Sequence, residues 1–328
     1  MPSRYPTFDR AALRLLPLAR RENDLTASVI RDPAPTATVR EPFARIAARL
    51  VAARQTGATR ALMLGAHVLR RGLQRYLVDL MESGCLDVVA VNGACAIHDF
   101  ELALIGATTE SVARYVREGQ FGLWRETGRL NDIVRQAAGD GLGLGEAVGR
   151  AIREGDFPGK ADSLLARAYA LDVPVTVHVG IGCDITHEHP NCDGAAYGAA
   201  SYRDFLVFTQ CLTRLAGGVV MNFGSAVTAP EVFLKALAMV RNATLARGEA
   251  MGGFASLVCD LRPLPETYAR QAPKSDPDYY FRPWKTMLVR TPGEGGESRY
   301  VRGDHAETVP ELWTALARLG AFEGAGRG

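Results

Sequence analysis

Short apolar runs that alternate with longer amphipathic segments are the strongest structural signal in this sequence. Each run is long enough for a strand but too short for a helix, and its apolar residues are continuous rather than alternating. Runs of this kind are typical of strands that are buried on both faces of a parallel sheet. We therefore predict an α/β fold, in which helices cover both faces of a parallel sheet. The predicted strands are residues 61–64, 86–91, 173–179, 219–223 and 254–261.

The remaining segments complete the predicted organisation. Helical patterns cover residues 68–83, 99–105, 201–215 and 310–319. A hairpin with a glycine-rich turn is predicted over residues 286–301. At the N-terminus, a helix is predicted over residues 8–21, followed by a linker rich in Pro, Thr and Arg at 31–40. We therefore divide the chain into an N-terminal helical arm, residues 1–40, and a single α/β domain, residues 41–328.

The composition argues against several classes of partner. The 328 residues include 38 basic and 36 acidic side chains, and the net charge of +2 is typical neither of a nucleic-acid-binding protein nor of a membrane-surface protein. No apolar run reaches the ~18 residues of a membrane-spanning helix. The polar start of the chain is unlike a secretory signal. The six cysteines form no CxxC pair, so we predict reduced thiols and a cytoplasmic protein.

Polar and glycine-rich segments follow the predicted strands. In a parallel sheet of this kind, ligands bind beyond the carboxyl ends of the strands. We therefore expect these segments to converge on one edge of the sheet. They are Gly65–His67, Asn92–Ala94, His178–Asp193, Asn222–Ser225 and Cys259–Asp260.

The histidines also gather at the predicted strand ends. A single histidine is most often a structural group, but all six of this chain lie in or beside such segments, at positions 67, 98, 178, 187, 189 and 305. The densest polar run is 178–194. Its Cys183, His187, His189 and Asp193 could bind zinc, although their spacing matches no strong zinc signature. We prefer a loop that binds a polar ligand through carboxylates, imidazoles and backbone amides.

A second unusual segment covers residues 276–286. It combines Asp276 and Asp278 with three consecutive aromatic residues, Trp284 and Lys285. Carboxylates and aromatic faces suit an organic cation, and a desolvated lysine can act as an amine nucleophile. The structural alternative is a loop packed by its own aromatic residues, with Lys285 in solvent.

Four segments together resemble the deoxyhypusine synthase family, and more closely its bacterial deoxyhypusine synthase-like branch. The likeness spans roughly residues 60–310, with the segments in the family's order. They are DVVAVNGACAIHDF at 87–100, HVGIGCDITHEHPNCD at 178–193, GVVMNFGS at 218–225 and YFRPWK at 280–285.

The resemblance implies a Rossmann-like subunit, a homotetramer and NAD bound near subunit interfaces. In that family NAD oxidises a polyamine, spermidine is cleaved at the resulting imine, and the aminobutyl group passes through an enzyme lysine to an acceptor amine. Lys285 looks like that lysine, although the glycine of the family's Trp-Gly-Lys motif is missing. Asn92–Ala94 looks like the cofactor turn. His98 and Asp99 stand where the family has acidic residues.

Other positions depart from the family pattern. The glycine triplet followed by Lys-His-His is here Asn222–Thr228, with neither lysine nor histidine. The Thr-Asp-Gly-Ser loop is here Gly180–Asp184. These departures favour a related reaction on a small amine, such as homospermidine formation, over modification of a translation factor.

The predicted site follows from both arguments. The predicted catalytic residues are Lys285, His187 and His189. The predicted NAD-binding residues are Gly65, Asn92, Gly93, Ala94, His98, Asp99, Gly224, Ser225 and Asp260. The predicted substrate-binding residues are Asp184, Glu188, Asp193, Asp278 and Trp284.

Three functional hypotheses follow. The first is an NAD-dependent aminobutyl transferase acting on a polyamine such as spermidine. The second keeps the fold without NAD, as a hydrolase or lyase, with or without a metal, acting on an amino compound. The third is an inactive, ligand-binding homologue.

Overall fold

The computed structural model describes residues 4–249 and 251–323. Its centre is a six-stranded sheet with the order β5-β3-β2-β6-β7-β8, in which every neighbouring pair is parallel. The predicted α/β, Rossmann-like fold class is confirmed. The strands are β2 (Arg60–Leu64), β3 (Val88–Asn92), β5 (Val175–His178), β6 (Val219–Phe223), β7 (Ala255–Asp260) and β8 (Glu297–Arg302).

The order of the strands determines where a ligand can bind. The chain begins in the middle at β2, adds β3 and β5 on one side, and then returns to place β6 on the other side of β2. This is the order of dinucleotide-binding sheets, in which the connections diverge at the switch point and leave a crevice. The switch point of this sheet lies between the carboxyl ends of β2 and β6.

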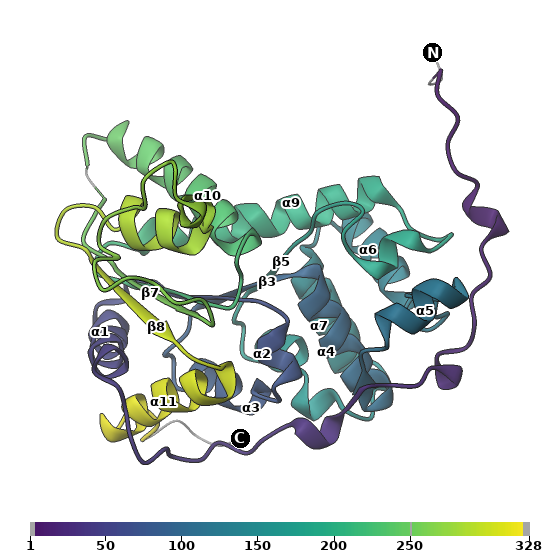
Figure 1. The fold of residues 1–328 in the computed structure, drawn as a ribbon, viewed down its shortest axis with the longest axis horizontal. Helices are drawn as coiled ribbons and strands as arrows, with labels where there is room; N and C mark the ends of the chain where they lie inside the picture. Colours follow the sequence, from purple (N-terminus) through teal and green to yellow (C-terminus); the bar gives the residue numbers. More distant parts are fainter. Residues whose placement is uncertain (1–3, 250, 324–328) are drawn as a thin grey trace.

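Helices cover both faces of the sheet, because successive side chains of each strand point in opposite directions. Leu62 and Leu64 pack with helices of one layer, and Ala61 and Met63 pack with the other. Figure 1 shows α9 and α10 along one face, and α1, α2, α3 and α11 along the other. The long helices are α1 (Glu41–Thr56), α4 (Gly93–Ile105), α6 (Arg129–Asp140), α7 (Leu144–Glu154), α9 (Gly194–Cys211), α10 (Thr228–Leu245) and α11 (His305–Arg318).

Shorter elements fill the connections. They are α2 (His67–Arg70), α3 (Gln74–Glu82), β4 (Ala107–Thr108), α5 (Val112–Glu118), α8 (Leu164–Ala170), a 3-10 turn at Ile185–Glu188, a 3-10 turn at Pro277–Tyr280 and a π-helix at Pro283–Arg290. Within the described ranges, no helix combines the length and the apolar character needed to cross a membrane.

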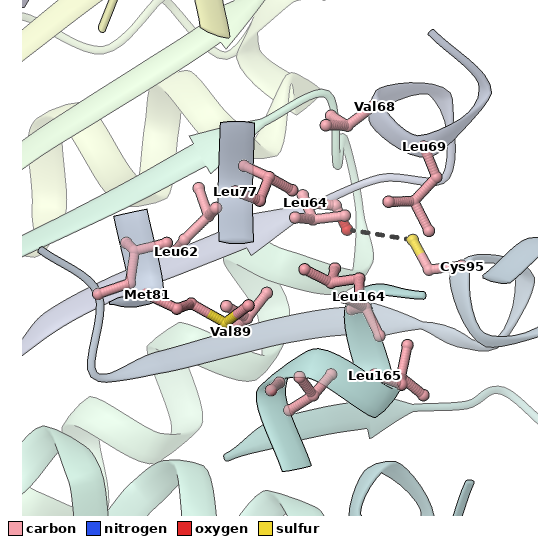
Figure 2. Close-up of a cluster of buried hydrophobic side chains, with 14 of the residues drawn as sticks. Leu62, Leu64, Val68, Leu69, Leu77, Met81, Val89, Cys95, Leu164 and Leu165 are labelled. Atoms are coloured by element: carbon pink, nitrogen blue, oxygen red, sulfur yellow. Dashed lines mark hydrogen bonds between the residues drawn. The ribbon is translucent and has the colours of Figure 1, made fainter. Parts of the chain in front are cut away.

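The core beneath the switch point joins several elements. Figure 2 shows Leu62 and Leu64 of β2 packed among side chains of β3 and the neighbouring helices. The Cys95 thiol points at the Leu64 carbonyl oxygen, at 3.8 Å. Each fully buried leucine in such a core contributes about 1.5–3 kcal/mol to stability. This packing holds the carboxyl end of β2 and the start of α4 in a rigid relation.

The predicted helix over residues 68–83 is broken in two. Gly72 has a φ of 72°, and α2 ends before this residue while α3 begins after it. A Cβ at Gly72 would overlap the Val29 carbonyl of the N-terminal arm. The arm also donates Arg31 N–H to the Gly72 carbonyl, at 2.9 Å. The break therefore results from a tertiary contact that the helical period does not reveal.

The N-terminal arm differs from the predicted helix over residues 8–21. It is mainly extended, with 3-10 turns at Arg10–Ala12, Leu18–Arg20 and Ala27–Val29, and a two-residue strand, β1 (Leu25–Thr26), paired with β4. Pro17 precedes the second turn and lacks the N–H that a helix would use. Figure 1 shows the arm, in purple, along the outside of the helical layer. Its apolar residues pack singly onto the body rather than as a helix face.

The predicted hairpin over residues 286–301 is also wrong. The first half is the π-helix at Pro283–Arg290, and the second half is β8, which pairs in parallel with β7. Both halves carry apolar residues, so the sequence pattern resembles two strands. The glycines at 293 and 295 have positive φ and turn the chain from helix to strand instead.

Candidate functional site

Gly65 and Gly224 allow the turns after β2 and β6 to pack closely together at the switch point. Gly65 donates its N–H to Phe223 O at 2.9 Å, and Gly224 donates to Cys259 O at 3.0 Å. A Cβ at Gly65 would overlap the carbonyl of Gly224. A Cβ at Gly224, whose φ is 70°, would overlap the imidazole of His305. Only glycine allows an approach this close. Both of these predicted cofactor-binding glycines lie where the strand order reverses.

Polar side chains surround these glycines. His67 and His305 begin α2 and α11, and burial lowers the pKa of both imidazoles. Ser225 accepts Ala229 N–H at 3.1 Å, at the start of α10. Asp260, at the end of β7, accepts Arg262 N–H at 3.1 Å through one carboxylate oxygen. The predicted strand-end residues therefore converge on one edge.

A carboxylate covers the start of α4. Asn92 caps this helix by accepting Cys95 N–H at 3.1 Å. A Cβ at Gly93 would overlap the carboxylate of Asp184, which arrives from the loop after β5. Burial raises the pKa of Asp184 to about 6. The N-terminus of a helix favours a negative charge, so this carboxylate is well placed although it is largely desolvated.

A cavity of about 220 Å³ opens beside Asp184. It lies between α4, the segment 109–121, the loop after β5 and the arm. Its apolar walls come from Ala94, Ile97, Val112, Phe121 and Ile185, and its polar groups are Arg21, His98, Glu101, Thr109, Glu110, Cys183 and Asp184. The cavity wall contains the carboxylates of Glu101, Glu110 and Asp184 but only one guanidinium, that of Arg21. When these groups are ionised, the wall therefore carries an excess of negative charge.

The carboxylates of the cavity are not equivalent. Arg21 and Glu101 form a bidentate ion pair in which each side chain is 1% exposed. Glu110 accepts Gly122 N–H at 2.9 Å and Trp124 Nε1–H at 2.8 Å, while burial raises its pKa. Asp184 has burial as the cause of its shift and no cation beside it. Asp184 is therefore the carboxylate with most to gain from a cationic ligand.

Thr109 marks the same cavity by its backbone. Its φ is 63°, which is rare for a β-branched residue and costs about 1–3 kcal/mol. Its hydroxyl oxygen is buried, with no hydrogen-bond partner among the described residues. Strain of this kind gathers at functional sites. Arg21, Glu101, Thr109 and Glu110 carry no signal in the sequence, because none of them lies in a polar or glycine-rich segment directly after a predicted strand.

The two predicted catalytic histidines hold the loop after β5. His187 Nδ1 accepts Gly182 N–H at 3.1 Å and Asp184 N–H at 3.2 Å. His189 is fully buried, and its Nε2 lies 2.8 Å from Gly122 O. Burial lowers the pKa of both. His187 thus holds the backbone of Asp184, His189 joins the loop to Gly122, and neither histidine lines the cavity.

Several other predicted residues also have structural contacts. Asp99 is buried and accepts Ser163 Oγ–H, Leu164 N–H and Leu165 N–H at the start of α8. Asp193 caps α9. Asp278 pairs with Arg262, and buried Trp284 donates to Tyr268 O at 2.7 Å. Burial raises the pKa of Glu188, and the negative charge of nearby Glu110 raises it further.

Lys285 lies in the other half of the edge. It is 7% exposed, within the π-helix, and its Nζ is 3.5 Å from the centroid of the Tyr279 ring. The π-helix packs against β7, β8 and α10. Asp184 lies at the start of α4, directly after β3, and three strand spacings separate β3 from β7, or about 14 Å. Within one chain, Lys285 and Asp184 therefore do not share a pocket.

The zinc alternative gains no support from the arrangement of side chains. In the part of the chain that the structure describes, no three His, Cys, Asp or Glu side chains are grouped as a metal site. Cys183 is exposed and Cys192 is half-buried. His187 and His189 instead bond to backbone groups, as described above.

Comparisons with known proteins support the fold alone. No family model matches the chain, and no curated protein matches its sequence. Among solved structures, apo ArgZ, an arginine dihydrolase from the ornithine–ammonia cycle in cyanobacteria, matches with a TM-score of 0.51 and 16% identity, over 87% of this chain and 34% of that chain. Unliganded AgrE matches with a TM-score of 0.53 and 15% identity, over 85% of this chain and 32% of that chain.

The chain spans about a third of the length of ArgZ and AgrE. A proposed deoxyhypusine synthase from Entamoeba histolytica also matches, with a TM-score of 0.43 and 10% identity, over 80% of this chain and 76% of that chain. That likeness is too distant to assign a family. The relationship shown is one of α/β fold, and the activity has to be argued from the site itself.

Proposed function

We propose that the protein is an NAD-dependent enzyme that acts on a small aliphatic amine. The observation that carries the proposal is the cavity beside α4, where Asp184 is half-buried with no cation beside it and the carboxylates outnumber the guanidinium. It lies next to the switch point of a sheet whose strand order is that of dinucleotide-binding folds.

The cavity suits an alkylammonium group. Asp184 offers a carboxylate to the charged nitrogen, and Ile97, Phe121 and Ile185 offer apolar surface to a methylene chain. Moving a cation into this desolvated site neutralises Asp184, whose ionised form burial disfavours. A neutral or anionic ligand would leave that cost in place.

The switch point fits a dinucleotide in part. Gly65 packs on the backbone of Gly224, and Gly224 packs on the imidazole of His305, so the turns after β2 and β6 approach each other with no side chain between them. Asp184 occupies the start of α4, so we place the pyrophosphate at the turn of Gly224 and Ser225 before α10. The second carboxylate oxygen of Asp260 makes no hydrogen bond among the described residues, and it suits a ribose hydroxyl.

At a finer level, we propose aminobutyl transfer from a polyamine such as spermidine. NAD, held at the turn of Gly224 and Ser225, would supply a hydride acceptor for the carbon next to the secondary amine and a hydride donor for the imine formed with the acceptor. Lys285 Nζ then bonds to the oxidised carbon as the C–N bond to the propylamine portion breaks, and that amine leaves. An acceptor amine displaces Lys285 in turn.

Calorimetry with the purified, dialysed protein tests the proposal. We expect NAD to bind and its affinity to change when spermidine is present, because the two sites adjoin. Asp184→Asn should weaken spermidine binding about tenfold or more, since a hydrogen-bonded charge contact is lost, and should leave NAD binding in place. Glu154→Gln, an exposed change on α7, is the matched control. Absence of NAD binding with and without spermidine would refute the NAD-dependent function.

A further inference from the structure

A buried hydrogen-bond network connects the N-terminal arm to the cavity. Glu101 accepts four hydrogen bonds: two from Arg21, both at 2.8 Å, one from Thr108 Oγ at 2.7 Å and one from Thr127 Oγ at 2.6 Å. An ionised carboxylate has no proton to donate, so both threonine hydroxyls must donate to it. The direction of each bond in the network is therefore determined.

The Thr108 hydroxyl also determines the direction of the hydrogen bond with His98. A hydroxyl has one hydrogen, and that of Thr108 is used on Glu101. Thr108 Oγ lies 2.8 Å from His98 Nδ1 and can only accept there. His98 must therefore carry its proton on Nδ1, which leaves a bare lone pair on Nε2.

His98 lies in the wall of the cavity. The residue lines the cavity with Glu110 and Asp184. No hydrogen bond among the described residues involves Nε2, and that atom is not sealed from solvent as the buried unpaired atoms are. Burial, aided by Arg70, Arg21 and His67 and opposed by Glu101, lowers the pKa of His98 to about 4. The ring is thus a neutral acceptor beside an acidic wall.

We infer that His98 is a ligand-binding residue whose Nε2 accepts an N–H of the bound cation, and that Glu101 and Thr108 are positioning residues that fix its tautomer. The assignment of the cation as an alkylammonium rests on the proposed function. A carboxylate alone would attract any cation, whereas a hydrogen bond to the imidazole nitrogen forms only with a cation that has an N–H to donate. The cavity therefore selects a primary or secondary ammonium over a quaternary one.

The tautomer can be measured without any ligand. Nitrogen-15 NMR of the imidazoles should show His98 with Nδ1 protonated and Nε2 bare at pH 7. Thr108→Ser keeps the hydroxyl and should keep that signature, whereas Thr108→Val, of nearly the same shape, should lose it. A proton on Nε2 of the wild-type protein, or an unchanged signature in Thr108→Val, would overturn the relay.

The selectivity is tested with butylamine and butyltrimethylammonium as probes in calorimetry. The wild type should bind butylamine at least about tenfold more tightly, since a hydrogen bond to a charged group contributes about 1.5–3 kcal/mol. His98→Leu should reduce that preference to about twofold, with its fold checked by circular dichroism. An unchanged preference in His98→Leu, or no butylamine binding to the wild type, would refute the inference. Butylamine binding without NAD binding would refute only the NAD-dependent function.

Discussion

Asp184 shows how one residue can cost stability and provide function. It is the residue that the loop after β5 presents at the start of α4, and its carboxylate is desolvated without a compensating cation. Two neighbours make this position of the carboxylate possible. The His187 imidazole accepts Asp184 N–H, and Gly93 has no side chain where the carboxylate lies. A protein that keeps a strained or desolvated group commonly uses it for binding.

The pH dependence of Asp184 can be predicted with its sign. Its pKa is raised on folding to about 6, so its contribution to stability is complete below the unfolded pKa and is lost as pH rises through about 6. Asp184→Asn should therefore raise the free energy of unfolding by about 1–3 kcal/mol at pH 8 and leave it unchanged at pH 3.5. Urea unfolding at both pH values measures this.

Ligand binding should show the opposite trend. The cavity attracts a cation only when Asp184 is ionised, so butylamine affinity should rise as pH increases through about 6 and then level off. In Asp184→Asn this rise should be absent, while Glu154→Gln should keep it. A wild-type affinity that is flat between pH 5 and 8 would contradict the role of Asp184.

Residue types were easier to predict than the directions of their side chains. Asp184, Asn92 and Gly93 were selected from the sequence, and the structure brings them together at one helix start. His189 and Asp99 were selected for the same reason, yet they bond to backbone groups in the interior. Position next to a strand end indicates proximity to the edge, but packing decides which way each side chain turns.

At the scale of elements, the N-terminal arm is the least predictable part. Its apolar residues suggested a helix, but the arm reaches the body as a largely extended segment: Leu18 packs with Tyr115 and Trp124, and Leu16 pairs with Trp124 in the same cluster. Arg21 reaches the cavity wall and is held there by Glu101. A buried guanidinium needs a carboxylate partner, and Glu101 supplies it. The arm is therefore fixed to the body at Arg21 and forms part of the cavity wall.

The arm's ion pair leads to a stability prediction. Arg21→Met should lower the free energy of unfolding by about 3–5 kcal/mol, because Glu101 is left buried without a counter-charge. Adding Glu101→Gln should restore a large part of that loss, since the buried charge is removed with its partner. Arg20→Met, an exposed change in the same turn, should stay within about 0.5 kcal/mol. A loss below about 1 kcal/mol for Arg21→Met in urea unfolding would contradict the burial of this pair.

At the scale of the whole molecule, the order of the strands divides the edge into two halves. Asp184, His98 and the cavity belong to the half of β3 and β5, and Lys285 and Asp260 belong to the half of β7. The switch point lies between them. A cofactor there would adjoin both halves.

The separation of the two halves predicts a clear difference between binding and transfer. Lys285→Ala should leave butylamine affinity within about twofold, because groups this far apart act independently. The same change should abolish the adduct that borohydride reduction traps with spermidine and NAD, as read by mass spectrometry. Lys274→Ala, an exposed lysine of the same connection, should keep the adduct. A trapped adduct in Lys285→Ala would eliminate Lys285 as the covalent residue.

The sequence by itself determined the fold class and the edge at which the site lies. Continuous apolar runs require strands buried on both faces, and parallel strands bring their carboxyl ends to a single edge. Only the tertiary structure decided that the arm contributes Arg21, that Thr109 and Glu110 close the cavity, and that His98 has a fixed tautomer. These depend on contacts between residues far apart in the chain, whose geometry is set by packing and by hydrogen-bond direction rather than by local pattern.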